Sequence, residues 1–101
     1  MDQGAPKAIV EDATYSVTFK ISYETKFGQE LAVVGSIGEL GEWKDYDHWL
    51  QWTDGHIWVS KAPLITKSST FRYKYALLDT DRNLIWESGV DRVAELSVLP
   101  A

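Results

Sequence analysis

A lysine, a tryptophan and a glutamate lie on two segments that are predicted to pair as a β-hairpin. Lys74 belongs to residues 71–77, in which large apolar side chains alternate with basic or small ones. Trp86 and Glu87 end the next apolar segment, after an acidic turn. Because facing and diagonal positions of a ladder are neighbours, we expect these three side chains to lie within reach of one another.

The length of the turn decides which residues of the two strands face each other. A loop of four residues, Asp79–Arg82, places Tyr75 opposite Trp86. It also places Lys74 opposite Glu87. A slip of one residue would bring Lys74 opposite Trp86 instead. In both registers Lys74 points away from the aromatic face of its strand.

The chemistry of this trio suits a ligand with one apolar face and a rim of hydroxyl groups, such as a pyranose ring. An indole packs against the C–H face of such a ring, while charged groups hydrogen-bond its hydroxyls. The same three residues also fit a cross-strand ion pair beside a rim tryptophan. The hairpin alone leaves both interpretations open.

A glycine-rich stretch at residues 33–43 offers a second tryptophan. Gly35, Gly38 and Gly41 recur at every third position, and Trp43 closes the stretch. This spacing suits a backbone with positive φ, and we expect the tryptophan after it to be exposed. It is not a dinucleotide-binding fingerprint, because the spacing differs and no helix is predicted to follow. We interpret the stretch as a loop that presents Trp43.

Catalytic and metal sites are weaker interpretations of this sequence. A glycosidase needs two carboxylates across a cleft, and a small single domain offers no obvious cleft. His48 and His56 lack a third ligand at metal spacing, so we interpret them as surface or turn histidines. We therefore predict no catalytic residues, no metal and no cofactor. The acidic candidates for an enzyme would be Asp45, Asp47, Glu87 and Asp91.

Elements of β type must position these residues. Alternating or β-branched apolar runs predict about seven to eight short strands and an all-β, antiparallel β-sandwich of immunoglobulin-like kind. Residues 44–54 are predicted to be mostly loop with a short strand near Leu50. Trp58, Leu96 and Val98 are expected in the core. The predicted strands are Tyr15–Tyr23, Leu31–Val34, His56–Ser60, Phe71–Leu77, Asn83–Glu87 and Val93–Leu99.

Composition limits the partners of the chain. Its 101 residues suit one domain, expected at 14–101, with residues 1–13 as a leader or linker. A net charge of -5 argues against nucleic acid or an anionic membrane as partner. No apolar run reaches the ~20 residues that span a bilayer. The absence of cysteine and of a signal-peptide pattern favours an intracellular over a secreted origin, although the localisation stays open.

The ordered set of these motifs resembles the starch-binding domain known as carbohydrate-binding module family 20. The resemblance covers nearly all of residues 14–99. The set is more specific than any single motif in it. The motifs are Val17–Tyr23, Gly28 after a loop aromatic, Val34-Gly35-Ser36, Leu40-Gly41-Glu42-Trp43, Trp58, Phe71-Arg72-Tyr73-Lys74-Tyr75 and Trp86-Glu87.

The resemblance implies a non-catalytic module that binds α-1,4-linked glucan such as starch, glycogen or maltooligosaccharides. In the first site of the family, Trp43 and Trp86 would stack on consecutive glucose rings, with Lys74 and Glu87 as hydrogen-bonding groups. The usual asparagine of that site falls at Asp91, which replaces an amide donor by a charge.

The resemblance also implies a second site and an attached enzyme. In the second site Phe27 stands where tyrosine is more common, and Trp52 would supply another aromatic ring. Domains of this family are joined to a catalytic domain in the same parent chain, which they target to polysaccharide. The alternative is an immunoglobulin-like module that binds another protein through the same exposed aromatic side chains.

Overall fold

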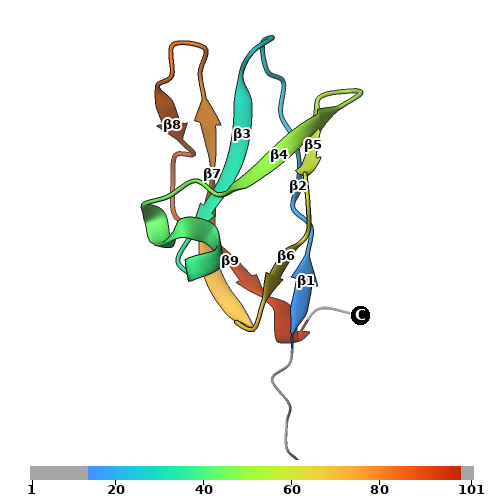
Figure 1. Cartoon of the computed structure of the whole chain (residues 1–101), viewed down its shortest axis with the longest axis vertical. Helices are drawn as coiled ribbons and strands as arrows, with labels where there is room; N and C mark the ends of the chain where they lie inside the picture. The colour runs from blue at the N-terminus through green and yellow to red at the C-terminus, as the bar shows by residue number, and fades with distance from the viewer. Residues whose placement is uncertain (1–13, 99–101) are drawn as a thin grey trace, which may run out of the picture.

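The structure is a computed structural model that describes residues 14–98, and antiparallel strands dominate it. The larger sheet has the order β2-β5-β4-β3-β7-β8, and β9 also pairs with β7. A separate two-stranded sheet joins β1 and β6. Figure 1 shows the larger sheet curled, with β7 and β8 on one side and β2 and β5 on the other. The elements are β1 (Tyr15–Val17), β2 (Lys20–Ser22), β3 (Glu30–Gly35), η1 (Gly38–Trp43), β4 (His48–Thr53), β5 (Ile57–Ser60), β6 (Leu64–Thr66), β7 (Thr70–Leu78), β8 (Leu84–Trp86), β9 (Arg92–Glu95) and η2 (Leu96–Val98).

The core lies between the inner faces of the curled sheet, as the predicted β-sandwich requires. The central strand β3 is buried at every position from Leu31 to Gly35, which explains its continuous apolar sequence. Trp58 is 5% exposed and belongs to the core, as expected. The all-β, antiparallel prediction is therefore confirmed. The buried core residues are Phe19, Leu31, Val33, Leu40, Leu50, Trp58, Leu64, Phe71, Tyr75 and Leu96.

The predicted first strand is two strands that pair with different partners. β1 pairs with β6 through Ser16 and Ile65, whereas β2 pairs with β5 through Ile21 and Trp58. At the break, the Phe19 N–H donates to the Ser60 hydroxyl oxygen at 2.8 Å instead of to a ladder carbonyl. The alternation of side chains survives, and the chain passes from one sheet to the other.

The strand predicted near Leu50 is present as β4, but it spans six residues, His48–Thr53, so the prediction that residues 44–54 are mostly loop is wrong. Aromatic side chains favour strands, and β4 places its His48 and Leu50 side chains in the interior. His48 is 9% exposed and hydrogen-bonds Ser60 through Nε2 at 2.9 Å. Burial lowers the pKa of His48, which is therefore not the surface histidine that the sequence predicted.

The end of the chain departs from the predicted long strand. β9 ends at Glu95, and the short η2 turn follows. Leu96 is buried as expected, but Val98 is 72% exposed and its predicted core position is wrong. The predicted leader or linker at 1–13 and residues 99–101 lie outside the described residues.

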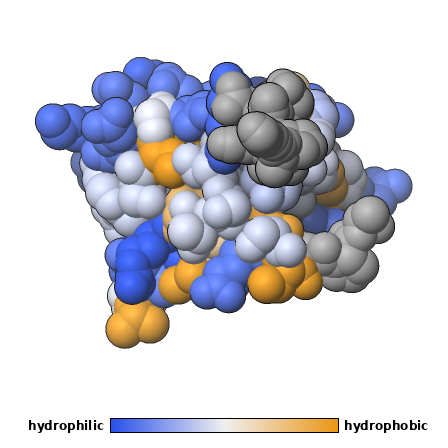
Figure 2. All heavy atoms as spheres, turned by 90° about the horizontal axis from the view of Figure 1, so that it is seen from below, coloured by the Kyte–Doolittle hydropathy of each residue, from blue (hydrophilic) through white to orange (hydrophobic). Residues whose placement is uncertain are grey.

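The surface of the molecule mixes hydrophobic and hydrophilic side chains. Figure 2 shows one end of the molecule, where hydrophobic side chains lie singly or in small groups between hydrophilic ones. Within residues 14–98 no helix has the length and hydropathy needed to cross a bilayer.

Candidate functional site

The hairpin of β7 and β8 has a tighter turn than the sequence predicted. The Asp79 N–H donates to the Asn83 carbonyl and the Arg82 N–H to the Asp79 carbonyl, both at 2.9 Å. Three residues therefore form the loop, and Arg82, the last of them, has φ +73°. A three-residue loop that ends in a left-handed residue is a common hairpin geometry. Both predicted registers are wrong, because Trp86 pairs with Ala76.

The observed register decides which side chains share a face of the sheet. Ala76 pairs with Trp86, and side chains two apart point the same way, so Lys74 and Trp86 lie on one face. Glu87 pairs with Tyr75 instead, through a 2.9 Å bond from the Glu87 N–H to the Tyr75 carbonyl. Tyr75 belongs to the core. The carboxylate of Glu87 therefore lies on the inner face, opposite to the ammonium group of Lys74.

The stretch that presents Trp43 is η1, a pair of short 3₁₀ turns with a kink, rather than an open loop. Gly41, Glu42 and Trp43 have φ values of +84°, +49° and +64°. Of the three spaced glycines, only Gly41 has positive φ, so the expected reason for the glycine spacing holds at one position. This left-handed run turns the chain outward just before the tryptophan side chain.

Gly35 has a different function, because it lets three elements approach closely. A Cβ atom at Gly35 would lie 2.6 Å from the Arg72 carbonyl oxygen and 2.7 Å from Cδ1 of Leu40. Leu40 is fully buried, which anchors η1 against the sheet. The end of β3, the start of β7 and η1 are thus packed through a position that only glycine fits.

Two tryptophans and a tyrosine form an aromatic cluster, which we call the first platform. The ring centroids of Trp43 and Trp86 are 6.0 Å apart, with 37° between the ring planes. Trp43 is half-buried and Trp86 is 36% exposed, so both rings keep an accessible surface. Tyr46 meets Trp86 edge-on at 6.1 Å. The sequence interpretation missed Tyr46, although aromatic residues so close after Trp43 were a signal for it.

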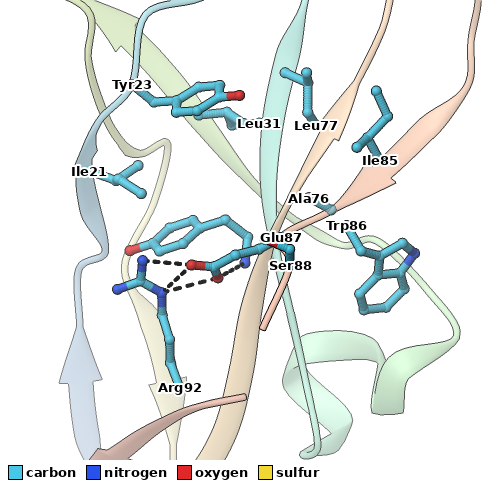
Figure 3. A pocket seen from close by; sticks show the side chains of 11 residues that line it. Ile21, Tyr23, Leu31, Ala76, Leu77, Ile85, Trp86, Glu87, Ser88 and Arg92 are labelled. Atoms are coloured by element: carbon cyan, nitrogen blue, oxygen red, sulfur yellow. Dashed lines mark hydrogen bonds and ion pairs between the residues drawn. The ribbon is translucent and has the colours of Figure 1, made fainter. Parts of the chain in front are cut away.

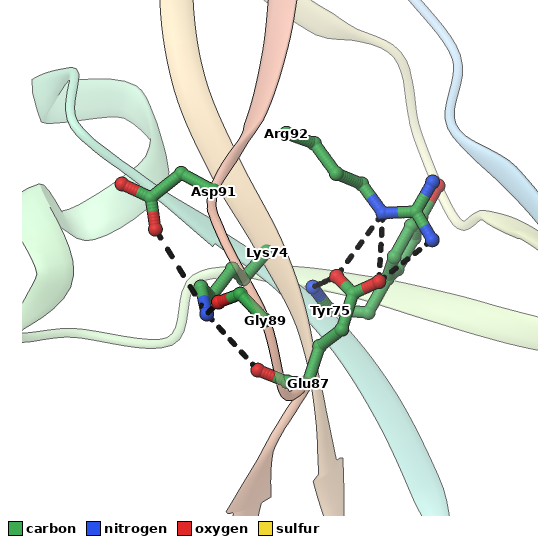
Figure 4. Close-up of polar contacts among 6 residues, drawn as sticks. All are labelled: Lys74, Tyr75, Glu87, Gly89, Asp91 and Arg92. Carbon is green, nitrogen blue, oxygen red and sulfur yellow. Dashed lines mark hydrogen bonds and ion pairs between the residues drawn. The ribbon is translucent and has the colours of Figure 1, made fainter.

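Lys74 ties down the loop that follows Trp86. Its Nζ donates to the Glu87 carbonyl oxygen at 3.1 Å and to the Gly89 carbonyl oxygen. Asp91 Oδ1 lies 3.9 Å from the same nitrogen, within ion-pair range but beyond hydrogen-bond distance. Figure 4 shows the three acceptors gathered around the Lys74 ammonium group. Lys74 and Asp91 thus lie together, as predicted for the rim of the site, and Glu87 joins them through its backbone.

The carboxylate of Glu87 is engaged elsewhere, as Figure 4 also shows. It accepts hydrogen bonds from Arg92 Nε at 2.9 and 3.1 Å and from the Tyr75 N–H at 3.2 Å. The hydrogen bond from Arg92 lowers the pKa of Glu87.

Arg92 also contacts the buried Tyr75. Its guanidinium carbon lies 5.0 Å from the centre of the Tyr75 ring. Burial raises the pKa of Tyr75 to about 12. Nothing in the sequence pattern had indicated Arg92.

Figure 3 shows where this ion pair lies relative to the first platform. Glu87 and Arg92 line a groove of about 450 Å³ whose other walls include Tyr23 and Ile85. Trp86 lines the edge of the same groove, but its side chain points away from Tyr23, toward η1. The strand β8 therefore has a groove-facing side and a platform side.

A second aromatic cluster, which we call the second platform, lies beside the turn that joins β4 and β5. Trp52 is 44% exposed and Phe27 is fully exposed. Both line one groove of about 440 Å³, together with His56 and Trp58. Trp52 Nε1 donates to His56 Nδ1 at 3.2 Å. The structure thus brings Phe27 and Trp52 to the same groove.

The residues that could serve in catalysis or in metal binding are dispersed or exposed. Asp45 and Asp47 lie exposed next to η1. Across residues 14–98, no group of three or more histidine, cysteine, aspartate or glutamate side chains is arranged to hold a metal ion. The aromatic platforms are therefore the candidate sites.

Comparison with protein families finds a match over the described part of the chain. The model of the family described as a starch binding domain matches residues 14–98. A glucoamylase of Neurospora crassa is 31% identical over 86 residues, which is 75% of this chain and 13% of the relative. An alpha-amylase of Streptomyces violaceus is 34% identical over 78 residues, 76% of this chain and 14% of the relative. An AA13 family lytic polysaccharide monooxygenase A of Aspergillus terreus is 29% identical over 92 residues, 86% and 23% of the two chains.

Solved structures show the same fold. A family 15 glucoamylase from Hypocrea jecorina superposes with a TM-score of 0.73 at 23% identity, covering 93% of this chain and 17% of that one. A gamma-CGTase from alkalophilic Bacillus clarkii gives a TM-score of 0.72 at 22% identity, covering 83% and 13%. The chain spans less than a quarter of each of these proteins. With the family match over the whole described chain, the conclusion is that this chain belongs to the starch-binding domain family, carbohydrate-binding module family 20.

Proposed function

We propose that the chain binds α-1,4-linked glucan at the first platform by stacking glucose rings on Trp43 and Trp86. The observation that carries this proposal is the pair of accessible indole rings 6.0 Å apart on the face that also carries Lys74. Indole faces match the C–H faces of pyranose rings. The angle of 37° between the two ring planes suits successive sugars of a twisted glucan chain better than those of a flat chain.

The polar rim of the first platform consists of Lys74 and Asp91 in this proposal. Two carbonyls take two of the three N–H donors of Lys74, so one donor is left for a ligand hydroxyl. Asp91, 3.9 Å away, is an acceptor for a neighbouring hydroxyl. Glu87 contributes through its backbone carbonyl, which orients Lys74, rather than through its carboxylate.

The second platform is proposed as a second glucan site. Phe27 and Trp52 line one groove, and their exposed rings offer the same kind of apolar surface as the first platform. Two sites on one polymer raise the effective concentration of the second binding event. We therefore expect long glucans to bind more tightly than short oligosaccharides.

We propose that the chain itself catalyses no reaction and targets an attached catalytic domain to polysaccharide. The relatives that support this are named as glucoamylase, alpha-amylase and polysaccharide monooxygenase, and each is much longer than this chain. Incubation with soluble starch should release no reducing ends above the level of a Glu87→Ala control.

Electrophoresis in a native gel that contains amylopectin tests glucan binding. The wild-type domain should be retarded, and soluble β-cyclodextrin should reverse the retardation. Trp43→Ala and Trp86→Ala should each weaken binding by at least about tenfold, because each removes one stacking surface. Ile85→Ala is the matched control, since Ile85 precedes Trp86 and its side chain lies on the opposite face of β8. Unretarded migration of the folded wild-type domain would favour the protein-interaction module instead.

A further inference from the structure

His56 joins the two halves of the second platform through one nitrogen atom. Its Nδ1 accepts hydrogen bonds from Trp52 Nε1 and from the Thr25 N–H, each at 3.2 Å. The imidazole also meets the Trp52 ring edge-on at 5.7 Å, with 88° between the planes. Trp52 lies on β4 and Thr25 begins the loop that carries Phe27, so this nitrogen links the two segments that supply the aromatic rings.

The position of Phe27 depends on how its loop is anchored. Phe27 is fully exposed, so core packing does not hold its ring. One side of the loop is tied by Thr25 to His56. The other side is tied by Gln29, whose Nε2 donates to Asp79 Oδ1 at 3.0 Å. These two side-chain anchors, together with the backbone hydrogen bond from the Tyr23 N–H to the His56 carbonyl at 3.0 Å, hold the loop that carries Phe27 beside Trp52.

The two anchors differ in how they respond to protons. Nδ1 of an imidazole accepts hydrogen bonds only when it carries no proton, and a proton there would face two N–H donors. Imidazole changes charge between about pH 5 and pH 8. The other anchor stays intact over that range, because the Gln29 side-chain hydrogen bond lowers the pKa of Asp79. The titratable side chains on the segments that meet His56 are Tyr23, Glu24 and Lys26 on the loop and Asp54 in its own turn, all exposed.

We propose that His56 is a positioning residue of the second platform, and that glucan binds there only while Nδ1 of His56 is an unprotonated acceptor for Trp52 and Thr25. This inference rests on the proposed function of that platform. It makes glucan binding at the second platform sensitive to a proton on this nitrogen, whereas the first platform contains no histidine.

Calorimetry with maltoheptaose tests this in a Trp43→Ala background, which removes the first platform. We expect affinity to fall about tenfold from about pH 8 to about pH 5, the effect of losing hydrogen bonds worth ~1.4 kcal/mol. His56→Asn places an amide oxygen near the Nδ1 position, and asparagine tolerates the φ of +59° at this residue. This variant should bind equally at both pH values. His56→Ala should bind weakly at both. Trp52→Ala with Trp43 intact, which keeps only the first platform, should show no such pH dependence.

The indole N–H signal of Trp52 in a ¹⁵N–¹H spectrum reports its hydrogen bond to His56 Nδ1 without any sugar present. It should shift between about pH 8 and about pH 5, and this shift should be absent in His56→Asn. Maltoheptaose binding at the second platform that stays equal at both pH values, or a Trp52 signal that does not shift between them, would overturn this inference and leave the proposed second site standing. Absence of binding at both pH values would overturn the second site, and this inference with it.

Discussion

At the scale of single residues, the rim of the first platform combines a partly satisfied lysine with an acidic side chain. Two backbone carbonyls hold the Lys74 ammonium group, and its side chain is only 15% exposed. Asp91 is 35% exposed at 3.9 Å from it. The Asp91 carboxylate accepts hydrogen bonds but cannot donate one, so a sugar hydroxyl oxygen that needs a donor finds none at this side chain.

Asp91→Asn is predicted to strengthen glucan binding about threefold, because an amide adds a donor whose hydrogen bond is worth ~0.6 kcal/mol net. The ion pair with Lys74 that it removes is long, at 3.9 Å, and contributes little. Titration calorimetry with maltoheptaose measures the change. Glu30→Gln, an equal change of charge at an exposed position of β3, is the control and should leave affinity unaltered. Weaker binding by Asp91→Asn would show that the sugar uses the charge itself.

His48 makes stability depend on pH. Burial lowers its folded-state pKa, so the unfolded chain takes up the proton more readily. The stability that neutral His48 contributes is complete above the unfolded pKa of about 6.5 and is lost as pH falls from there toward the folded pKa.

His48→Gln should reduce that dependence, because the amide does not titrate and still reaches Ser60. Urea unfolding at about pH 7.5 and about pH 5.5 measures it, in a His56→Asn background so that His48 is the only histidine. An unchanged pH dependence in His48→Gln would refute the assignment. Glu87 does not interfere, since its pKa is lowered and its contribution is lost only below about pH 4.5.

At the scale of elements, the first platform depends on how η1 is packed against β3 and β7. Gly35→Ala is predicted to destabilise the domain by about 2 to 4 kcal/mol, because its Cβ would meet the Arg72 carbonyl oxygen at 2.6 Å. Chemical denaturation measures the loss. Gly38→Ala is the matched control, since its Cβ would have only Glu42 Oε2 at 3.6 Å. Equal stability of the two variants would contradict this account of the glycine spacing.

Much of the fold could be predicted from the sequence, because two-faced strands and turn residues are local signals. The buried run of β3 and the Asp54-Gly55 turn before β5 are examples. β4 was predicted only as a short strand near Leu50, because the irregular spacing of its aromatic residues hides its full length of six residues. The break between β1 and β2 depends on the hydroxyl of Ser60, which is 41 residues from Phe19.

The sequence predicted which residues of the candidate site lie together better than it predicted their geometry. Trp43, Trp86, Lys74 and Asp91 do lie together, but the hairpin register depends on a left-handed Arg82, which no turn-residue preference announces. That one-residue difference moves the Glu87 carboxylate to the inner face. Arg92 lies only five residues after Glu87, but it follows the predicted hairpin, so the strand-pairing pattern did not indicate it as a partner of Glu87.

At the scale of the whole molecule, the chain is a small acidic domain with two aromatic platforms. Its net charge is -5, and the proposed ligand is neutral. The platforms offer stacking surfaces and hydroxyl contacts rather than a basic surface. Binding therefore needs no release of counterions.

Glucan affinity is predicted to change less than about twofold between low and high salt, because Coulomb attraction between charges is not its source. Calorimetry with maltoheptaose over a series of sodium chloride concentrations provides the measurement. A steep, linear fall of log affinity with log salt would indicate that a charged partner is the true ligand.

The tryptophan indole signals test the central claim most directly. In Trp52→Ala protein, which lacks the second platform, maltoheptaose should shift the ¹⁵N–¹H indole signals of Trp43 and Trp86 more than that of the buried Trp58. The shifts should saturate together, because one ligand covers both rings. Unmoved Trp43 and Trp86 signals at saturating sugar, or no saturation at all, would contradict the proposal that these two rings bind glucan.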